Sequence, residues 1–362
     1  MSRSARKKKP AASSAAEIIW KLPQAQNMCF GHEQAEEIFA QAEKLGRMPH
    51  AWIFHGLRGI GKATLAHKLA RIYLAKELPA SVRRENGEFD FAHYFWRQYS
   101  AGIFPNMRII SLDEQSTTKE IGIEEIRETA PLLHLSAAAN KRRVVIIDAI
   151  EDLSTEATNA LLKWLEEPPA DFLFLLITHK FGSLLPTIPS RCQRLRIKPV
   201  SPEITARVLK NILPNNFETA LKWMELAPGQ PGILARLLQK NLLPLIEELF
   251  AFPSADSKLQ ALYNLALRAA TQKSAAAWSL WMEVVDVWFL HLLRRKSGVS
   301  CNLSSLPILQ NKPVPEDFLA RFSLEQLQEI WEKSRATLGD VSRIYLDPQH
   351  AMLACFADFT KK

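Results

Sequence analysis

Three short runs of apolar residues limit what this chain can fold into. They are nearly continuous rather than alternating, which is typical of strands in a parallel sheet covered on both faces. Segments with helical periodicity lie between and around them. Strand and helix in alternation predict a doubly wound α/β domain. The predicted strands are 51–55, 143–148 and 172–178, and the predicted helices are 62–76, 122–135 and 154–167.

The remainder of the chain has a different character. Eleven of the 13 glycines lie at or before Gly232, and a scarcity of glycine suits long helices. We expect three short helices at 202–213, 217–226 and 233–239, and further helices from about residue 245 to the end. A stripe at helical spacing indicates either a bundle core or a contact with another subunit; its members are Trp281, Val284, Val285, Trp288 and Leu292.

These patterns divide the chain of 362 residues, which is too long for one compact core. The prediction is an α/β class followed by an all-α class. We expect a basic arm at 1–25, an α/β domain at 26–199, a small helical lid at 200–243 and a helical domain at 244–362. The most apolar helix, 278–293, is interrupted by charged residues and does not resemble a membrane span.

The net charge of +8 is concentrated at the N-terminus. Five positive side chains precede Pro10, so the rest of the chain is only mildly basic, which argues against a surface that coats duplex DNA. We interpret the arm as a disordered, solvated tail in preference to a specific nucleic-acid contact. The four cysteines lie far apart in the sequence, so neither a metal site nor a disulfide framework is expected, and a reducing cytoplasm fits.

A glycine-rich loop follows the first predicted strand and opens a helix. Gly56, Gly59, Gly61 and Lys62 occupy the sequence Gly-Leu-Arg-Gly-Ile-Gly-Lys, which has the spacing of a phosphate-binding P-loop. Small residues allow backbone N–H groups to surround phosphates, and the helix N-terminus adds positive potential. Lys62 is predicted to reach the β- and γ-phosphates of a nucleotide.

Two positions next to this loop lack the groups that hydrolysis needs. The motif ends in Ser or Thr, whose hydroxyl binds Mg²⁺, but this chain has Ala63, and Thr64 is displaced about 100° around the helix. Asp148 ends a central strand and is suited to hold Mg²⁺ through water, but Ala149 follows in place of an acidic residue. We predict weak ATP binding without competent hydrolysis; the alternative is a loop kept only for folding.

Residues 77–115 contain a cluster of aromatic side chains and are predicted to be an insertion in the α/β domain. Such rings stack on nucleic-acid bases in some proteins. A local hydrophobic core is the favoured interpretation, because aromatic side chains bury a large apolar area.

Three segments resemble clamp-loader subunits of bacterial DNA polymerase III, which belong to the AAA+ class, and most closely the delta-prime family. They are the strand 144–148, the segment Asn-Ala-Leu-Leu-Lys-Trp-Leu-Glu-Glu-Pro-Pro at 159–169, and Leu-Leu-Pro-Thr-Ile-Pro-Ser-Arg-Cys at 184–192, which ends in the family's Ser-Arg-Cys motif. The resemblance covers about 150 residues, from 51 to 199. It implies a RecA-like domain, a three-helix lid and a C-terminal helical collar. Many relatives have a four-cysteine zinc module where 77–115 lies, and no zinc is expected here because that stretch contains no cysteine.

The resemblance also implies roles for single residues. Arg191 would act as an arginine finger in trans at the ATP site of a neighbouring subunit; the alternative is an ordinary surface arginine. Thr178 would be a polar sensor of the γ-phosphate, with His179 as an equally open choice. Gly232 stands where active relatives often carry a phosphate-contacting arginine, and Arg236 is an uncertain substitute.

The function implied is that of a delta-prime-like stator, which is part of the polymerase holoenzyme but not catalytic alone. Its partners would be a gamma/tau-like ATPase and a delta-like subunit in a hetero-pentamer that loads the sliding clamp on primed DNA in the cytoplasm, with no membrane involved. The alternative functions are a self-sufficient AAA+ ATPase acting on DNA and a pure interaction scaffold.

Overall fold

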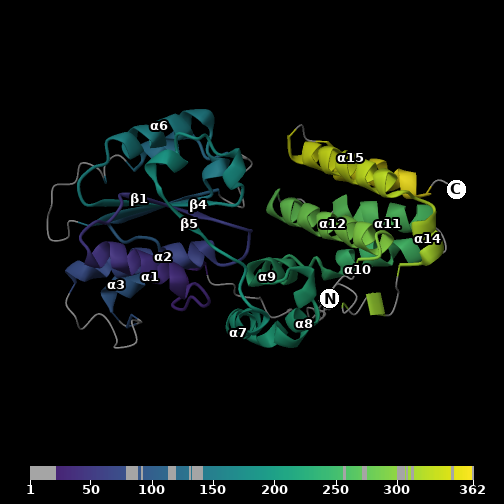
Figure 1. The fold of residues 1–362 in the computed structure, drawn as a ribbon, viewed down its shortest axis with the longest axis horizontal. Coiled ribbons are helices and arrows are strands. Elements are labelled where there is room, and N and C mark those ends of the chain that lie inside the picture. The colour runs from purple at the N-terminus through teal and green to yellow at the C-terminus, as the bar shows by residue number, and fades with distance from the viewer. Residues whose placement is uncertain are drawn as a thin grey trace, which may run out of the picture.

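The computed structural model describes residues 22–78, 89–90, 93–112, 120–129, 132, 142–255, 258–270, 275–299, 306, 309–310, 314–343 and 346–360. An α/β part with a central sheet and a part built from helices lie side by side (Figure 1). Short helices α7 to α9 lie below and between them in this view. The basic arm predicted at 1–25 lies almost entirely outside the described residues.

The sheet has five parallel strands in the order β2-β3-β4-β1-β5. Because all of them run in the same direction, their C-terminal ends meet at one edge, where α/β proteins place their sites. The two central strands, β3 and β4, are buried almost throughout, as their continuous apolar sequences predict. The strands are β1 (Ala51–His55), β2 (Met107–Ser111), β3 (Arg143–Asp148), β4 (Phe172–Thr178) and β5 (Gln193–Arg196).

Helices cover both faces of the sheet (Figure 1). One face is covered by α1 (Glu33–Lys44), α2 (Lys62–Leu74) and α3 (Tyr94–Ser100). The other is covered by α4 (Ile123–Arg127) and α6 (Thr155–Glu166). Side chains from alternate positions of the strands enter the two separate hydrophobic cores that result. This layering is that of a doubly wound domain.

The predicted insertion at 77–115 needs one correction. Its last part contains β2, which pairs with β3 and forms an edge of the sheet, so the insertion ends before Met107. The continuous apolar pattern used to find strands missed β2, because Arg108 and Ser111 interrupt it. Four of the aromatic side chains form a core as predicted, since Phe89, Phe95, Trp96 and Tyr99 are buried and join the core under α2. Tyr94 is 53% exposed and does not, and Phe91 lies outside the described residues.

The described residues that follow β5 are mainly helical. The first three helices are α7 (Pro202–Ile212), α8 (Phe217–Lys222) and α9 (Pro231–Gln239). The following helices are α10 (Leu243–Ala251), α11 (Lys258–Ala270), α12 (Ala275–Lys296), α14 (Glu316–Ala320), α15 (Leu324–Arg343) and α16 (Pro348–Phe356). Short 3-10 helices connect elements throughout the chain: η1 (Pro23–Ala25), η2 (Ala75–Glu77), η4 (Ile150–Asp152), η5 (Phe181–Ser183), η6 (Pro189–Arg191), η7 (Pro214–Asn216), η8 (Met224–Leu226), η9 (Phe252–Ser254) and η11 (Ala357–Thr360).

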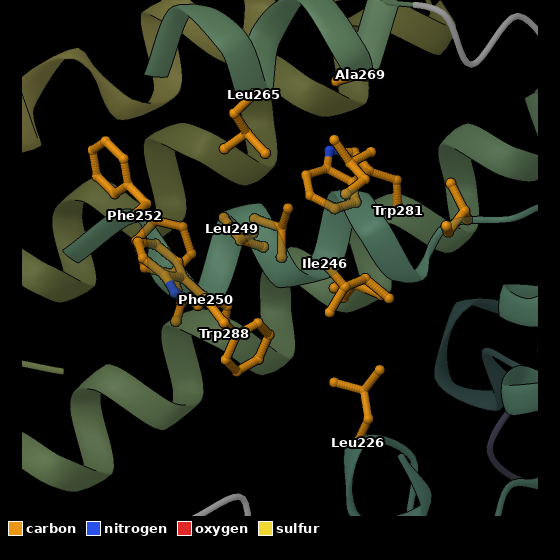
Figure 2. Packing of buried hydrophobic residues seen from close by; sticks show 14 of the residues in the cluster. Leu226, Ile246, Leu249, Phe250, Phe252, Leu265, Ala269, Trp281 and Trp288 are labelled. Carbon is orange, nitrogen blue, oxygen red and sulfur yellow. The ribbon is translucent and has the colours of Figure 1, made fainter. Parts of the chain in front are cut away.

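One continuous hydrophobic core joins these helices, from Leu209 in α7 to Phe359 near the end. Figure 2 shows part of it: Leu226, from η8 in the first group of helices, lies below Ile246 of α10 in this view, and both belong to the same hydrophobic cluster as Trp281 of α12. The stripe predicted on α12 is fully within this core, since Trp281 and Trp288 are 0% exposed. It is therefore a bundle core in this chain and not a free subunit contact.

The predicted fold class, a parallel α/β domain followed by all-α segments, is confirmed. The three predicted strands coincide with β1, β3 and β4. The helix predicted at 122–135 is shorter in the described residues, where α4 ends at Arg127. No helix in the described ranges combines the length and the apolar character that crossing a bilayer requires. The domain boundaries remain predictions.

Candidate functional site

The glycine-rich loop connects the end of β1 to the start of α2. Gly56, Gly59 and Gly61 have φ angles of 150°, 76° and 100°, which residues other than glycine rarely adopt. A Cβ on Gly56 would lie 2.3 Å from the carbonyl oxygen of Ile197, which follows β5. The backbone of this loop therefore requires glycine at these positions, and α2 begins directly after it, at Lys62. Ala63 and Thr64 follow in its first turn, and both are half-buried.

Lys62 is directed at its own loop. Its side chain is 2% exposed, and Nζ donates to the carbonyl oxygens of Leu57 at 2.6 Å and Gly56 at 2.7 Å. Burial lowers the pKa of this ammonium to about 8, and the carboxylates of Asp148 and Glu151 oppose the shift. In this structure the lysine predicted to bind phosphates instead donates hydrogen bonds to two carbonyl groups of the loop, Gly56 O and Leu57 O.

Two further carbonyl groups of the loop accept hydrogen bonds from outside it. The N–H of Gly232, in α9, donates to Gly59 O at 2.9 Å, and His32 Nε2 bonds Ile60 O at 2.8 Å. Burial lowers the pKa of His32, which favours the neutral ring. A Cβ on Gly232 would lie 2.9 Å from the backbone of Gly59, so the close contact itself excludes an arginine at position 232.

The loop also reaches the C-terminal helices. Arg58 NH1 donates to Ser279 Oγ at 3.3 Å, and its Nε lies 3.8 Å from Glu283 Oε1. Both partners are on α12. Burial raises the pKa of Glu283, and Arg58 opposes that shift. The loop is thus bonded to α9 and to α12 at the same time.

Acidic side chains gather beside the loop at the C-terminal edge of the sheet. Asp148 ends β3, and burial raises its pKa, while Arg236, Lys62 and Arg58 oppose the shift. Glu151 belongs to η4, the turn that follows, and its Oε1 accepts the backbone N–H of His179 at 2.7 Å. Within the described ranges, no three His, Cys, Asp or Glu side chains come together as a metal site would need.

The two candidates for the polar sensor differ in their surroundings. Thr178 is fully buried, and its Oγ1 accepts the N–H of Lys180 at 3.1 Å. His179 Nε2 lies 4.0 Å from Asp148 Oδ1, so its ring is the one beside the acidic edge. Burial, aided by Lys62 and Arg58, lowers the pKa of His179 to about 2, which keeps the ring neutral. Arg236 is exposed and close enough to oppose the rise in the pKa of Asp148.

Arg191 is at the surface, at the end of η6. Its NH2 donates to Glu166 Oε1 at 2.8 Å, and NH1 donates to Thr187 O at 2.9 Å and to Ser190 Oγ at 3.4 Å. The side chain is 34% exposed. Cys192, the last residue of the Ser-Arg-Cys motif, is a free thiol whose pKa burial raises to about 12, so it is not reactive.

Sequence reasoning did not find the partners of these residues. The loop motif leaves position 58 variable, and Glu283 is one of the charged residues that interrupt the apolar segment 278–293. A charge inside an apolar helix is itself a signal, since such a group is rarely buried without a partner. Glu166 and His32 gave no sequence signal, because their roles depend on contacts between distant segments.

Comparison with known proteins gives three related results. The family described as DNA polymerase III, delta subunit, matches residues 31–201. The DNA polymerase III subunit delta' of Escherichia coli is 27% identical over 261 residues, which cover 70% of this chain and 73% of that protein. The subunit delta' of Pseudomonas aeruginosa is 30% identical over 203 residues, covering 56% and 60%.

The subunit gamma of Buchnera aphidicola from Schizaphis graminum is also similar, at 32% identity over 207 residues, covering 55% of this chain and 53% of that protein. The chain thus spans about half the length of the curated relatives that match first. Among solved structures, a DNA polymerase III gamma subunit-related protein from Thermotoga maritima covers 91% of this chain and 98% of its own, with 20% identity and a TM-score of 0.36.

Proposed function

We propose that this chain, whose sequence matches the family described as DNA polymerase III, delta subunit, and several subunits delta', belongs to the bacterial clamp-loader family of the AAA+ class and acts as its delta-prime-like stator. In this role it joins a gamma/tau-like ATPase and a delta-like subunit in a cytoplasmic hetero-pentamer. The assembly opens the sliding clamp and places it on primed DNA. This subunit supplies Arg191 in trans to the ATP site of its neighbour.

The observation that carries the proposal is the placement of Arg191. Its side chain is 34% exposed at the end of the short turn η6 and is therefore not buried within its own domain. A guanidinium has five N–H donors in a rigid fork that suits phosphate oxygens. An arginine finger stabilises the negative charge that develops on a transferring phosphoryl group, with effects of about 10³–10⁵ in rate.

The chain's own loop supports a role without hydrolysis. The residues present do not complete a site for Mg²⁺-ATP, because Ala63 has no hydroxyl and Ala149 no carboxylate. In addition, the Lys62 ammonium donates to Gly56 and Leu57, so a phosphate group would have to replace those bonds. We therefore propose that this subunit binds ATP weakly or not at all and that its loop mainly joins structural parts.

The test is the steady-state ATPase activity of the assembled complex. Arg191→Ala and Arg191→Lys should each lower turnover by at least ten-fold, because lysine keeps the charge but not the fork. Arg196→Ala is the matched control, since Arg196 is an exposed arginine five residues away. Size-exclusion chromatography must show intact complexes. Unchanged turnover in Arg191→Ala would refute the finger and favour a scaffold.

A second measurement addresses the self-sufficient ATPase. The purified chain should show no ATP hydrolysis above that of a Lys62→Ala variant. In the assembled complex, measured at a temperature where the variant stays folded, Lys62→Ala should change turnover little. Hydrolysis by the isolated chain that Lys62→Ala abolishes would replace the stator proposal with an independent ATPase.

A further inference from the structure

The Arg191 guanidinium is held in one orientation by contacts on two sides. NH1 bonds two groups of its own turn, Thr187 O and Ser190 Oγ, while NH2 bonds Glu166 of a different element. These contacts use three of the five N–H donors of the side chain. Within the described residues, Nε–H and the second NH2 hydrogen make no hydrogen bond. The exposed part of the fork therefore keeps donors for another molecule.

Glu166 is well suited to fix this orientation. It is the last residue of α6, a twelve-residue helix that starts at a Ser154 cap and buries Leu161 and Leu165 against the sheet. Its carboxylate thus stands on a rigid element rather than on a loop. The C-terminal end of a helix also carries partial negative charge, which favours a nearby cation. Both effects hold the guanidinium at this end of α6.

We infer that Glu166 is a positioning residue for Arg191: its carboxylate sets the direction in which the finger presents its free N–H donors to the neighbouring ATP site. The inference rests on the proposed function. Preorganisation of this kind matters because catalytic groups need to be held within about 0.5 Å of the productive geometry. Without Glu166, NH1 still bonds Thr187, but the fork can rotate about that contact.

The effect should be moderate, because the ion pair lies near the surface. The Arg191 side chain is 34% exposed and that of Glu166 is 50% exposed. Exposed pairs contribute little to stability, and the change in turnover should be roughly two- to five-fold. This is far below the effect expected for removing Arg191 itself, so the two roles can be separated by size.

The experiment measures kcat and KM for ATP in the assembled complex, with Glu166→Ala, Glu166→Gln and Glu167→Ala. Glu166→Ala should lower kcat with KM nearly unchanged. Glu166→Gln keeps an acceptor oxygen for NH2 and should recover most of the loss. Glu167→Ala is the matched control, since Glu167 is exposed and forms no ion pair in the described part of the chain.

The decisive readout is the double variant. If Glu166 acts through Arg191, Glu166→Ala has no further effect in the Arg191→Ala background. An equal fall in both backgrounds indicates a merely structural role and overturns the inference. So does a rise in kcat in Glu166→Ala, which would mean that the carboxylate restrains the finger. Normal turnover in Arg191→Ala refutes the proposed function instead, so the two failures are distinguishable.

Discussion

Arg58 of the P-loop and Glu283 of α12 form an ion pair that links the two halves of the molecule, with 3.8 Å between Nε and Oε1. The residues are 225 positions apart, and Ser279 on the same helix accepts a hydrogen bond from the same guanidinium. Together with the Gly232–Gly59 bond, this pair makes the loop a junction between the α/β domain and the helices. Such a junction suits a subunit whose parts keep a fixed arrangement.

Replacing Glu283 by Ala should loosen this junction. The pair is partly exposed on both sides, so the loss in stability is about 1 kcal/mol or less. The clearer result should be local: faster amide hydrogen exchange in the loop at 56–61 and in the first half of α12. Glu316→Ala is the control, because it removes a surface pair with Arg295 that does not involve the loop. Equal exchange in the loop of both variants would contradict the junction.

Lys62→Met should destabilise the protein even without nucleotide. The buried ammonium satisfies the carbonyl groups of Gly56 and Leu57, and a buried acceptor left without a partner costs about 1–3 kcal/mol. Thermal unfolding followed by circular dichroism should show a lower midpoint. Lys68→Met, on the same helix, removes a half-buried pair with Glu36 and should shift the midpoint less. A midpoint unchanged by Lys62→Met would mean that these two bonds are not important for stability.

Gly59→Ala should be more harmful than Gly46→Ala, although both glycines have left-handed φ angles of 76° and 65°. The conformation alone costs about 1–2 kcal/mol for alanine at either position. Only at Gly59 does the new Cβ meet neighbouring backbone, 2.7 Å from Ile233 N, whereas nothing lies within 4 Å at Gly46. Thermal midpoints of the two variants compare these costs. Equal decreases in the thermal midpoint would show that the loop and α9 can move apart at little cost in stability to make room for the new Cβ.

Local patterns predicted much of the α/β domain. The apolar runs that form β1, β3 and β4 are continuous because helices cover both faces of those strands. The spacing of apolar residues in a sequence follows directly from which side chains are buried. β2 and β5 lie at the edges of the sheet, where one side of the strand is less covered. Their sequences contain Arg108 and Arg194, so a search for continuous apolar runs does not identify β2 and β5 as strands.

Spacing in the sequence points to residues of the candidate site but not to the contacts between them. Spacing identifies Gly56 and Lys62, because a phosphate loop needs them at fixed positions. Spacing does not tell whether the Lys62 ammonium binds a phosphate or the carbonyl groups of Gly56 and Leu57, because the same sequence allows both arrangements. Nor does it reveal the Arg58–Glu283 pair, which depends on how α12 packs against a loop that lies more than 200 residues earlier in the sequence.

The neutral His179 should make the protein sensitive to acid. Burial, with Lys62 and Arg58 nearby, lowers its pKa to about 2, whereas an unfolded chain protonates histidine near 6.5. Above pH 6.5 both states are neutral and this group costs nothing. As the pH falls from 6.5 toward about 2, only the unfolded chain gains the proton, so stability decreases; by pH 5 the loss from one such group is about 2 kcal/mol. His179→Asn should therefore flatten the fall in thermal midpoint between pH 7 and pH 5.

His350→Asn supplies the comparison for this measurement. His350 is exposed and lies on α16, away from the loop, so this variant controls for the loss of an imidazole ring as such. Part of the slope should remain in His179→Asn, because burial also lowers the pKa of His67, to about 3, and its contribution has the same sign. If the pH dependence of His179→Asn equals that of the unmodified chain, the ring of His179 is protonated in the folded protein. The arrangement of neutral ring, Asp148 and buried Lys62 would then be wrong.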